Sequence, residues 1–162
     1  MRKIAGYLGL MRCRRLLDRR HLESTRRLQI TVLSIGCGGV VGALGRYSLS
    51  LALPTQPGRF PWDTFVINLS GSLVLGFLLV LMIEQFPRGR LARPVIGTGI
   101  LGAYTTFSTF SVGNAQLWRA GSALTSLSYI VGSVLGGLMA VWVGMTAARV
   151  AMRLERWLQE SP

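Results

Sequence analysis

The sequence predicts an all-α protein that crosses a membrane four times. Three stretches contain no charged residue, and they are 20, 25 and 29 residues long: 64–83, 94–118 and 120–148. A helix spans a bilayer with about 20 mostly apolar residues, so each stretch is long enough. A fourth stretch, 28–53, is interrupted only by Arg46. Charged residues make up 15% of the 162-residue chain, whereas soluble domains carry about 25%.

The first 27 residues are strongly basic and contain 9 of the 18 Lys and Arg residues. We interpret 1–27 as a cytoplasmic tail on an anionic membrane surface. A cleavable signal peptide is disfavoured, because its apolar core has only about 7–15 residues. Met1 and Met11 both remain candidate translation starts. The net charge of +12 is better explained by topology than by nucleic-acid binding, since basic residues beside spans mark the cytoplasmic side.

The first two spans are predicted at about 28–53 and 62–83. The first is rich in glycine and alanine at three- and four-residue spacing, a pattern that lets transmembrane helices approach closely. Pro54 ends it, and a short loop follows. The second span begins with Trp62, a residue type enriched at membrane interfaces. The next segment, 84–93, is a charged loop.

The third span, about 94–118, is unusual in composition. Its central positions Thr105–Ser111 contain five hydroxyl residues in seven. Ser and Thr often bond back to their own helix, but so many at one depth indicate a functional segment. We expect the helix to break at Gly102–Thr105. Carbonyls freed by such a break must be buried in protein or bind an ion.

If the segment after this break is helical, its aromatic rings and its hydroxyl groups lie on different faces of the helix. At 100° per residue, Phe107 and Phe110 share one face, while Thr105, Ser108 and Thr109 share another.

The fourth span is predicted at about 123–148, and 149–162 forms an amphipathic C-terminal tail. The N-terminal tail, the 84–93 loop and the C-terminal tail carry 15 basic residues together, whereas the other two loops carry only Arg59 and Arg119. This distribution predicts that both termini are cytoplasmic.

Catalysis is disfavoured by the composition. The single histidine, His21, lies in the basic tail, and the two cysteines, Cys13 and Cys37, are far apart. No nucleophile–base pair or metal-ligand cluster falls within the spans, so the chain is not expected to be an enzyme. The polar candidates inside the membrane are Asn68, Thr105, Ser108, Thr109, Tyr129 and Ser133. Such groups either join helices together or line a pathway.

Three ordered motifs resemble the Fluc (CrcB) family of small fluoride channels. They are Thr105–Ser111 (TTFSTFS), Gly39–Tyr47 (GVVGALGRY) and Asn68–Ser72 (NLSGS). Together the similarity covers roughly residues 30–148, which include all four spans.

The resemblance implies a fluoride-selective channel in the inner (plasma) membrane, made of two subunits packed antiparallel. It implies that backbone carbonyls of Gly102 and Thr105 hold a structural sodium ion that is not transported. The fluoride pathway would be lined by Asn68, Phe107, Ser108, Thr109, Phe110, Tyr129 and Ser133, with Arg46 at a vestibule. Amide and hydroxyl donors can replace the water around fluoride, and aromatic edges carry positive partial charge.

Two features depart from this family pattern. Gly113 stands where many relatives carry an acidic residue. The uneven basic charge favours one orientation, whereas an antiparallel homodimer needs both. A homodimer and a heterodimer with an oppositely oriented paralogue therefore remain alternatives.

Two other functions are weighed against a channel. A four-span proton-coupled multidrug exporter needs a carboxylate inside the membrane, but Asp63 and Glu84 lie at span ends. A non-conducting assembly subunit would show no ion flux and would tolerate replacement of Phe107.

Overall fold

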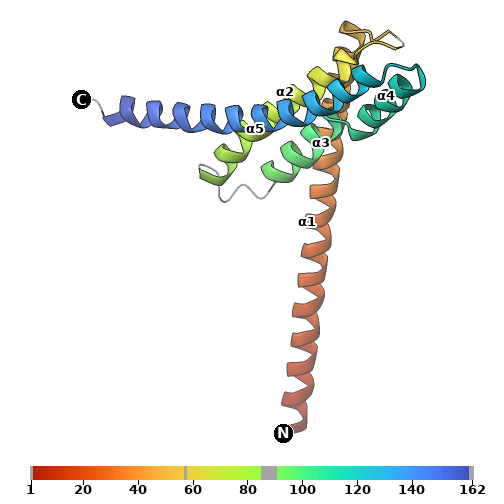
Figure 1. Ribbon diagram of the computed structural model, residues 1–162. Coiled ribbons are helices and arrows are strands. Elements are labelled where there is room, and N and C mark those ends of the chain that lie inside the picture. The colour runs from red at the N-terminus through yellow and green to blue at the C-terminus, as the bar shows by residue number, and fades with distance from the viewer. Residues whose placement is uncertain (1, 57, 85–90, 161–162) are drawn as a thin grey trace.

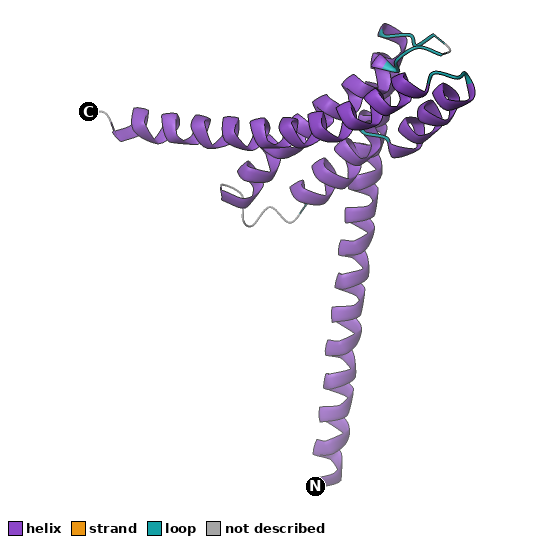
Figure 2. Ribbon diagram, viewed as in Figure 1, coloured by secondary structure: helices purple, strands orange, loops and turns teal. Residues whose placement is uncertain are grey.

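The computed structural model describes residues 2–56, 58–84 and 91–160, and its regular elements are all helices (Figures 1 and 2). They are α1 (Arg2–Ala52), α2 (Trp62–Glu84), η1 (Pro94–Leu101), α3 (Gly102–Tyr104), α4 (Phe107–Arg119) and α5 (Ala123–Glu160). Four segments among the described residues are long and apolar enough to cross a membrane: Thr25–Ala52, Trp62–Glu84, Pro94–Arg119 and Ala123–Gln159. The prediction of four spans with an interrupted third one is confirmed.

The first and last helices extend beyond the predicted spans. α1 begins at Arg2, so the segment that we interpreted as a basic tail and the first span share one helix of 51 residues. α5 continues past 148 to Glu160 and has 38 residues. At 1.5 Å per residue it is about 57 Å long, and a bilayer core of about 30 Å cannot contain all of it.

α2 and α5 run side by side and form the closest helix pair (Figure 1). Gly144 of α5 permits this contact, because a Cβ there would overlap the carbonyl oxygen of Leu73. Towards the C-terminal end of the pair, Val80, Ala148 and Met152 form a buried apolar cluster. The small residues at this crossing therefore bring the two backbones together, as the sequence pattern indicated.

α1 crosses the other helices and packs on the first part of the third span (Figure 1). Gly42 lies at the crossing, where a Cβ would overlap the carbonyl oxygen of Ile100. This part of the span, η1, is a π-helix: the amide of Gly102 reaches back five residues to the carbonyl of Gly97. The break that the sequence predicts at Gly102–Thr105 lies later: Gly102–Tyr104 is the short helix α3, and extended backbone begins at Thr105. The π-helix before it was not predicted, since π-helices are rare.

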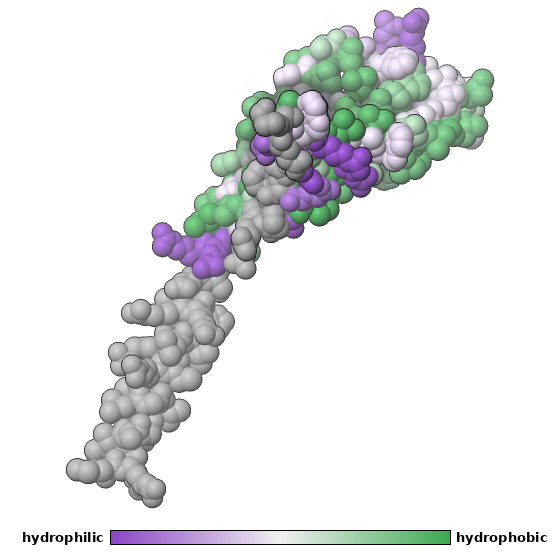
Figure 3. Space-filling model, turned by 90° about the vertical axis from the view of Figure 1, so that its left-hand side faces the viewer, coloured by the Kyte–Doolittle hydropathy of each residue, from purple (hydrophilic) through white to green (hydrophobic). Residues whose placement is uncertain are grey.

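The outer surface is largely apolar. Figure 3 shows hydrophobic and weakly polar residues over most of the described surface on that face, with hydrophilic residues in a few small patches. Leu33, Phe107 and Leu124 are 70%, 79% and 78% exposed. Exposed apolar surface of this extent fits contact with lipid or with another membrane helix.

Candidate functional site

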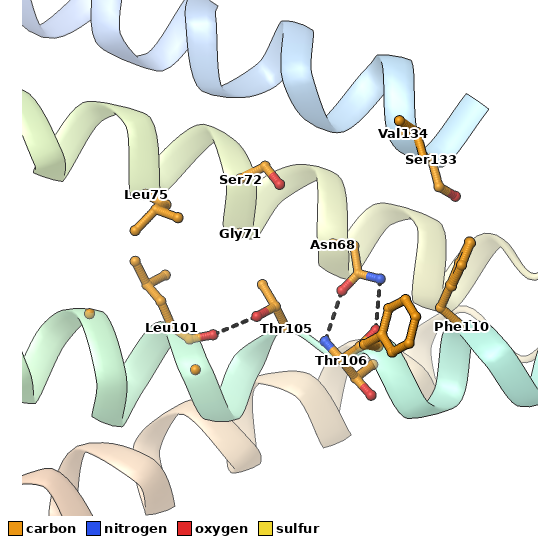
Figure 4. Close-up of a pocket in the computed structure, with 13 residues that line it drawn as sticks. Asn68, Gly71, Ser72, Leu75, Leu101, Thr105, Thr106, Phe110, Ser133 and Val134 are labelled. Atoms are coloured by element: carbon orange, nitrogen blue, oxygen red, sulfur yellow. Dashed lines mark hydrogen bonds between the residues drawn. The ribbon is translucent and has the colours of Figure 1, made fainter. Parts of the chain in front are cut away.

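A pocket of about 450 Å³ lies where α2, the interrupted third span and α5 meet (Figure 4). Its lining includes Asn68 from α2, Thr105 and Thr106 at the interruption, Phe107 and Phe110 from α4, and Ser133 from α5. Amide, hydroxyl and aromatic groups from three segments therefore converge on one space.

The interruption lies at Thr105 and Thr106. Thr105 has φ −76° and ψ 156°, and Thr106 has φ −147° and ψ 125°, both in the extended region. Asn68 holds this extended segment in place. Its Oδ1 accepts the amide of Thr106 at 2.9 Å, and its Nδ2 donates to the Thr106 carbonyl at 3.0 Å.

Thr106 also starts the second half of the span. Its hydroxyl oxygen accepts the backbone amide of Thr109 at 3.2 Å, which is the preferred geometry for the residue before a helix. The same oxygen lies 3.2 Å from the hydroxyl of Ser108 and 3.1 Å from that of Thr109. Three hydroxyls thus cluster at the start of α4.

On sequence grounds Thr105, rather than Thr106, was expected in this cluster. That assignment assumed a continuous helix from Thr105, but the helix restarts at Phe107. The Thr105 hydroxyl instead donates to the carbonyl of Leu101 at 2.8 Å. A threonine directly before a helix is a capping signal, and it was the clue to Thr106 that the analysis missed.

Two carbonyls at the interruption lose their usual helical donors. In an α-helix the carbonyl of residue i pairs with the amide of residue i+4. The amide that would pair with Gly102 belongs to Thr106 and goes to Asn68, and the one for Thr105 belongs to Thr109 and goes to the Thr106 hydroxyl. Carbonyl oxygens in this state are suitable ligands for a hard cation such as sodium.

Aromatic rings form a continuous row beside the pocket. The centroids of Phe107 and Phe110 are 5.8 Å apart, and those of Phe110 and Tyr129 are 5.0 Å apart. Phe60, in the loop before α2, contacts Tyr129 at 5.2 Å in an edge-on arrangement. The two phenylalanines that the sequence placed on one face do lie together.

Two hydroxyls on α5, those of Tyr129 and Ser133, are buried without a hydrogen bond of standard geometry among the described residues. Tyr129 is fully buried and does not line the pocket, and Thr64 lies close enough to be a hydrogen-bond partner of its hydroxyl. Ser133 does line the pocket. Burying a hydroxyl without a partner is costly, so the Ser133 hydroxyl indicates a site that offers a hydrogen bond to something other than the protein.

The remaining predicted residues do not line this pocket, and Ser108 and Tyr129 line neither it nor the next one. Thr109 lines a second pocket of about 510 Å³, together with Arg59, Asp63 and Gly113. Arg46, on α1, is half-buried and does not line either pocket.

Similarity to known proteins covers the helical region. Residues 33–145 match the family described as "CrcB-like protein, Camphor Resistance (CrcB)". A Nocardia farcinica protein named "Fluoride-specific ion channel FluC 2" is 45% identical over 120 residues, which cover 74% of this chain and 86% of that protein. "Fluoride-specific ion channel FluC 1" of Streptomyces coelicolor is 42% identical over 134 residues, which cover 82% of this chain and 85% of that one. "Fluoride-specific ion channel FluC 2" of Moorella thermoacetica is 44% identical over 120 residues, covering 72% and 94%.

Proposed function

The chain belongs to the CrcB-like family, and on that premise we propose that it is a fluoride-specific ion channel that conducts through the pocket beside Thr106. The observation that carries this function is the meeting of hydrogen-bond donors and aromatic rings in a pocket whose lining, among the described residues, includes no carboxylate. A proton-coupled exporter would need one there. Asp63 lies in the second pocket bonded to Thr55, and Glu84 lies at the end of α2 beside Arg156.

The donors suit a small, strongly hydrated anion. Asn68 uses one of its two Nδ2 hydrogens on Thr106, so the other remains available to an ion. The buried hydroxyls of Tyr129 and Ser133 can each donate one bond. We propose that these groups replace water around fluoride, and that the clustered hydroxyls of Ser108 and Thr109 continue the pathway.

The rings of Phe107 and Phe110 have a complementary role. Aromatic edges carry positive partial charge, so they attract an anion without binding it as strongly as an ammonium or guanidinium group would. Conduction requires such weak, repeated binding.

The carbonyls of Gly102 and Thr105 are the proposed holders of a structural sodium ion. The diverted amides of Thr106 and Thr109 support this assignment. A bound cation would raise the electrostatic potential near the pathway.

A second chain packed antiparallel would complete the pore. The Phe107 ring is 79% exposed in the single chain although it lines the pocket. A partner that covers this side would exclude lipid from the pathway, as an ion route through a membrane requires. We propose either a homodimer or a heterodimer with an oppositely oriented paralogue, in the plasma membrane with both termini of this chain cytoplasmic.

Such a channel would export fluoride passively. Hydrogen fluoride enters cells as the neutral acid and dissociates inside, and the inside-negative potential then drives the anion out.

Fluoride efflux from liposomes that contain the purified chain tests this function. With the chain alone if it forms a homodimer, or with its paralogue if it forms a heterodimer, we expect fast fluoride efflux, no chloride efflux and loss of fluoride efflux in Phe107→Ile. Equal efflux of both anions, or an unaffected Phe107→Ile variant, would contradict the function.

The form of the dimer needs a separate test. Tags on the termini that are detected on both sides of the membrane support a homodimer. Tags detected only on the cytoplasmic side support the heterodimer, and efflux should then require the paralogue.

A further inference from the structure

We propose that Asn68 acts as a positioning residue: it keeps the third span interrupted and thereby keeps the Gly102 carbonyl available to a cation. This role rests on the proposed function, because sodium is the cation assigned to that position.

The contact between Asn68 and Thr106 has the form of a pairing between two β-strands (Figure 4). An extended residue presents its N–H and C=O on the same side, and in an antiparallel sheet both groups bond to one residue of the next strand. Thr106 is extended, with φ −147° and ψ 125°. Oδ1 and Nδ2 of Asn68 meet its amide and carbonyl at 2.9 and 3.0 Å. One carboxamide thus takes the place of a neighbouring strand.

This pairing competes directly with helix formation. If Thr106 became helical, its amide would donate to the carbonyl of Gly102 four residues earlier. Asn68 accepts that amide instead, so Gly102 keeps an oxygen without its helical donor. Within a membrane such an oxygen is costly unless it finds another partner, and a cation meets that need.

The chemistry of the side chain explains why asparagine suits this position. A carboxamide supplies both an acceptor for the amide and a donor for the carbonyl. Aspartate keeps the acceptor, and when protonated it supplies both groups. Alanine supplies neither, so it would let the Thr106 amide return to Gly102.

Thermal unfolding of the purified full chain as a function of sodium concentration tests this role, with N-methyl-D-glucamine replacing sodium at constant ionic strength. We expect sodium to raise the melting temperature of the wild type. The sodium midpoint is the sodium concentration that gives half of this increase in melting temperature. In Asn68→Ala the sodium midpoint should rise by about tenfold or more, which is the loss of binding affinity expected when one favourable contact is removed. Asn68→Asp keeps the acceptor for the Thr106 amide, so its sodium midpoint should not rise.

Ser70→Ala is the matched control. Ser70 also lies on α2 and also contacts the third span, through the Tyr104 hydroxyl at 2.8 Å, but its hydrogen bonds go to Val66, Ile67 and Tyr104 rather than to Thr106. Its removal should lower the melting temperature without moving the sodium midpoint.

An Asn68→Ala variant with the wild-type sodium midpoint would overturn the role. If that variant does not fold, Asn68→Asp decides: a midpoint raised tenfold there refutes the role, and a midpoint that does not rise supports it. Fluoride efflux is measured on the same wild-type protein. Efflux without sodium-dependent stabilisation overturns the role while the channel function stands. Stabilisation that Asn68→Ala loses, in protein that shows no efflux either alone or with the paralogue, supports the role and contradicts the channel function.

Discussion

Ser133→Ala should increase stability and decrease conduction. The Ser133 hydroxyl is buried beside the pocket with no hydrogen bond of standard geometry among the described residues. Burying such a group costs about 1–3 kcal/mol in protein mutational data. Alanine removes that cost together with a single small atom, so the variant should unfold at the same or a higher temperature than the wild type.

The effect on conduction has the opposite sign. A hydrogen bond to a charged group contributes about 1.5–3 kcal/mol. If the hydroxyl donates to fluoride as it passes, losing that bond should lower the fluoride efflux rate by about 10- to 160-fold. Efflux is measured with a fluoride electrode outside loaded liposomes, and stability by thermal unfolding in detergent.

Ser128→Ala provides the control for this prediction. Ser128 lies on the same helix, but it is exposed and donates to the carbonyl of Leu124 at 2.8 Å, so both readouts should stay near wild type. A Ser133→Ala variant that conducts normally and unfolds at a lower temperature would refute the reasoning, because the hydroxyl would then serve only the fold.

Two further predictions concern the fold that holds the pocket. Gly144→Ala should destabilise the protein by about 1–3 kcal/mol, because its Cβ would overlap the Leu73 carbonyl oxygen. The control variant Gly36→Ala should not destabilise the protein, because a Cβ at Gly36 meets nothing within 4 Å. Equal melting temperatures for the two variants would contradict the close contact at Gly144. Thr106→Ala should lower stability by about 0.5–2 kcal/mol through loss of the helix cap, whereas Thr106→Ser should retain most of it; an alanine variant as stable as the serine variant would argue against the cap.

The sequence alone determined the number of spans and the region of the third span in which the helix is interrupted, although the extended residues are Thr105 and Thr106 rather than the whole of 102–105. Both depend on local properties: the length of each uncharged stretch, and a run of glycine and hydroxyl residues that cannot pack as ordinary lipid-facing helix. The pairing of Phe107 with Phe110 was also local, since residues three apart share a helix face.

The tertiary structure decided which polar groups meet. Asn68 and Thr106 are 38 positions apart. No periodicity in the sequence around either residue indicates that the Asn68 carboxamide bonds both the amide and the carbonyl of Thr106. The same holds for Tyr129, whose ring meets Phe110 from a different helix. Contacts between helices depend on which faces pack and at what depth, and close approaches such as that of Gly144 to Leu73 set both.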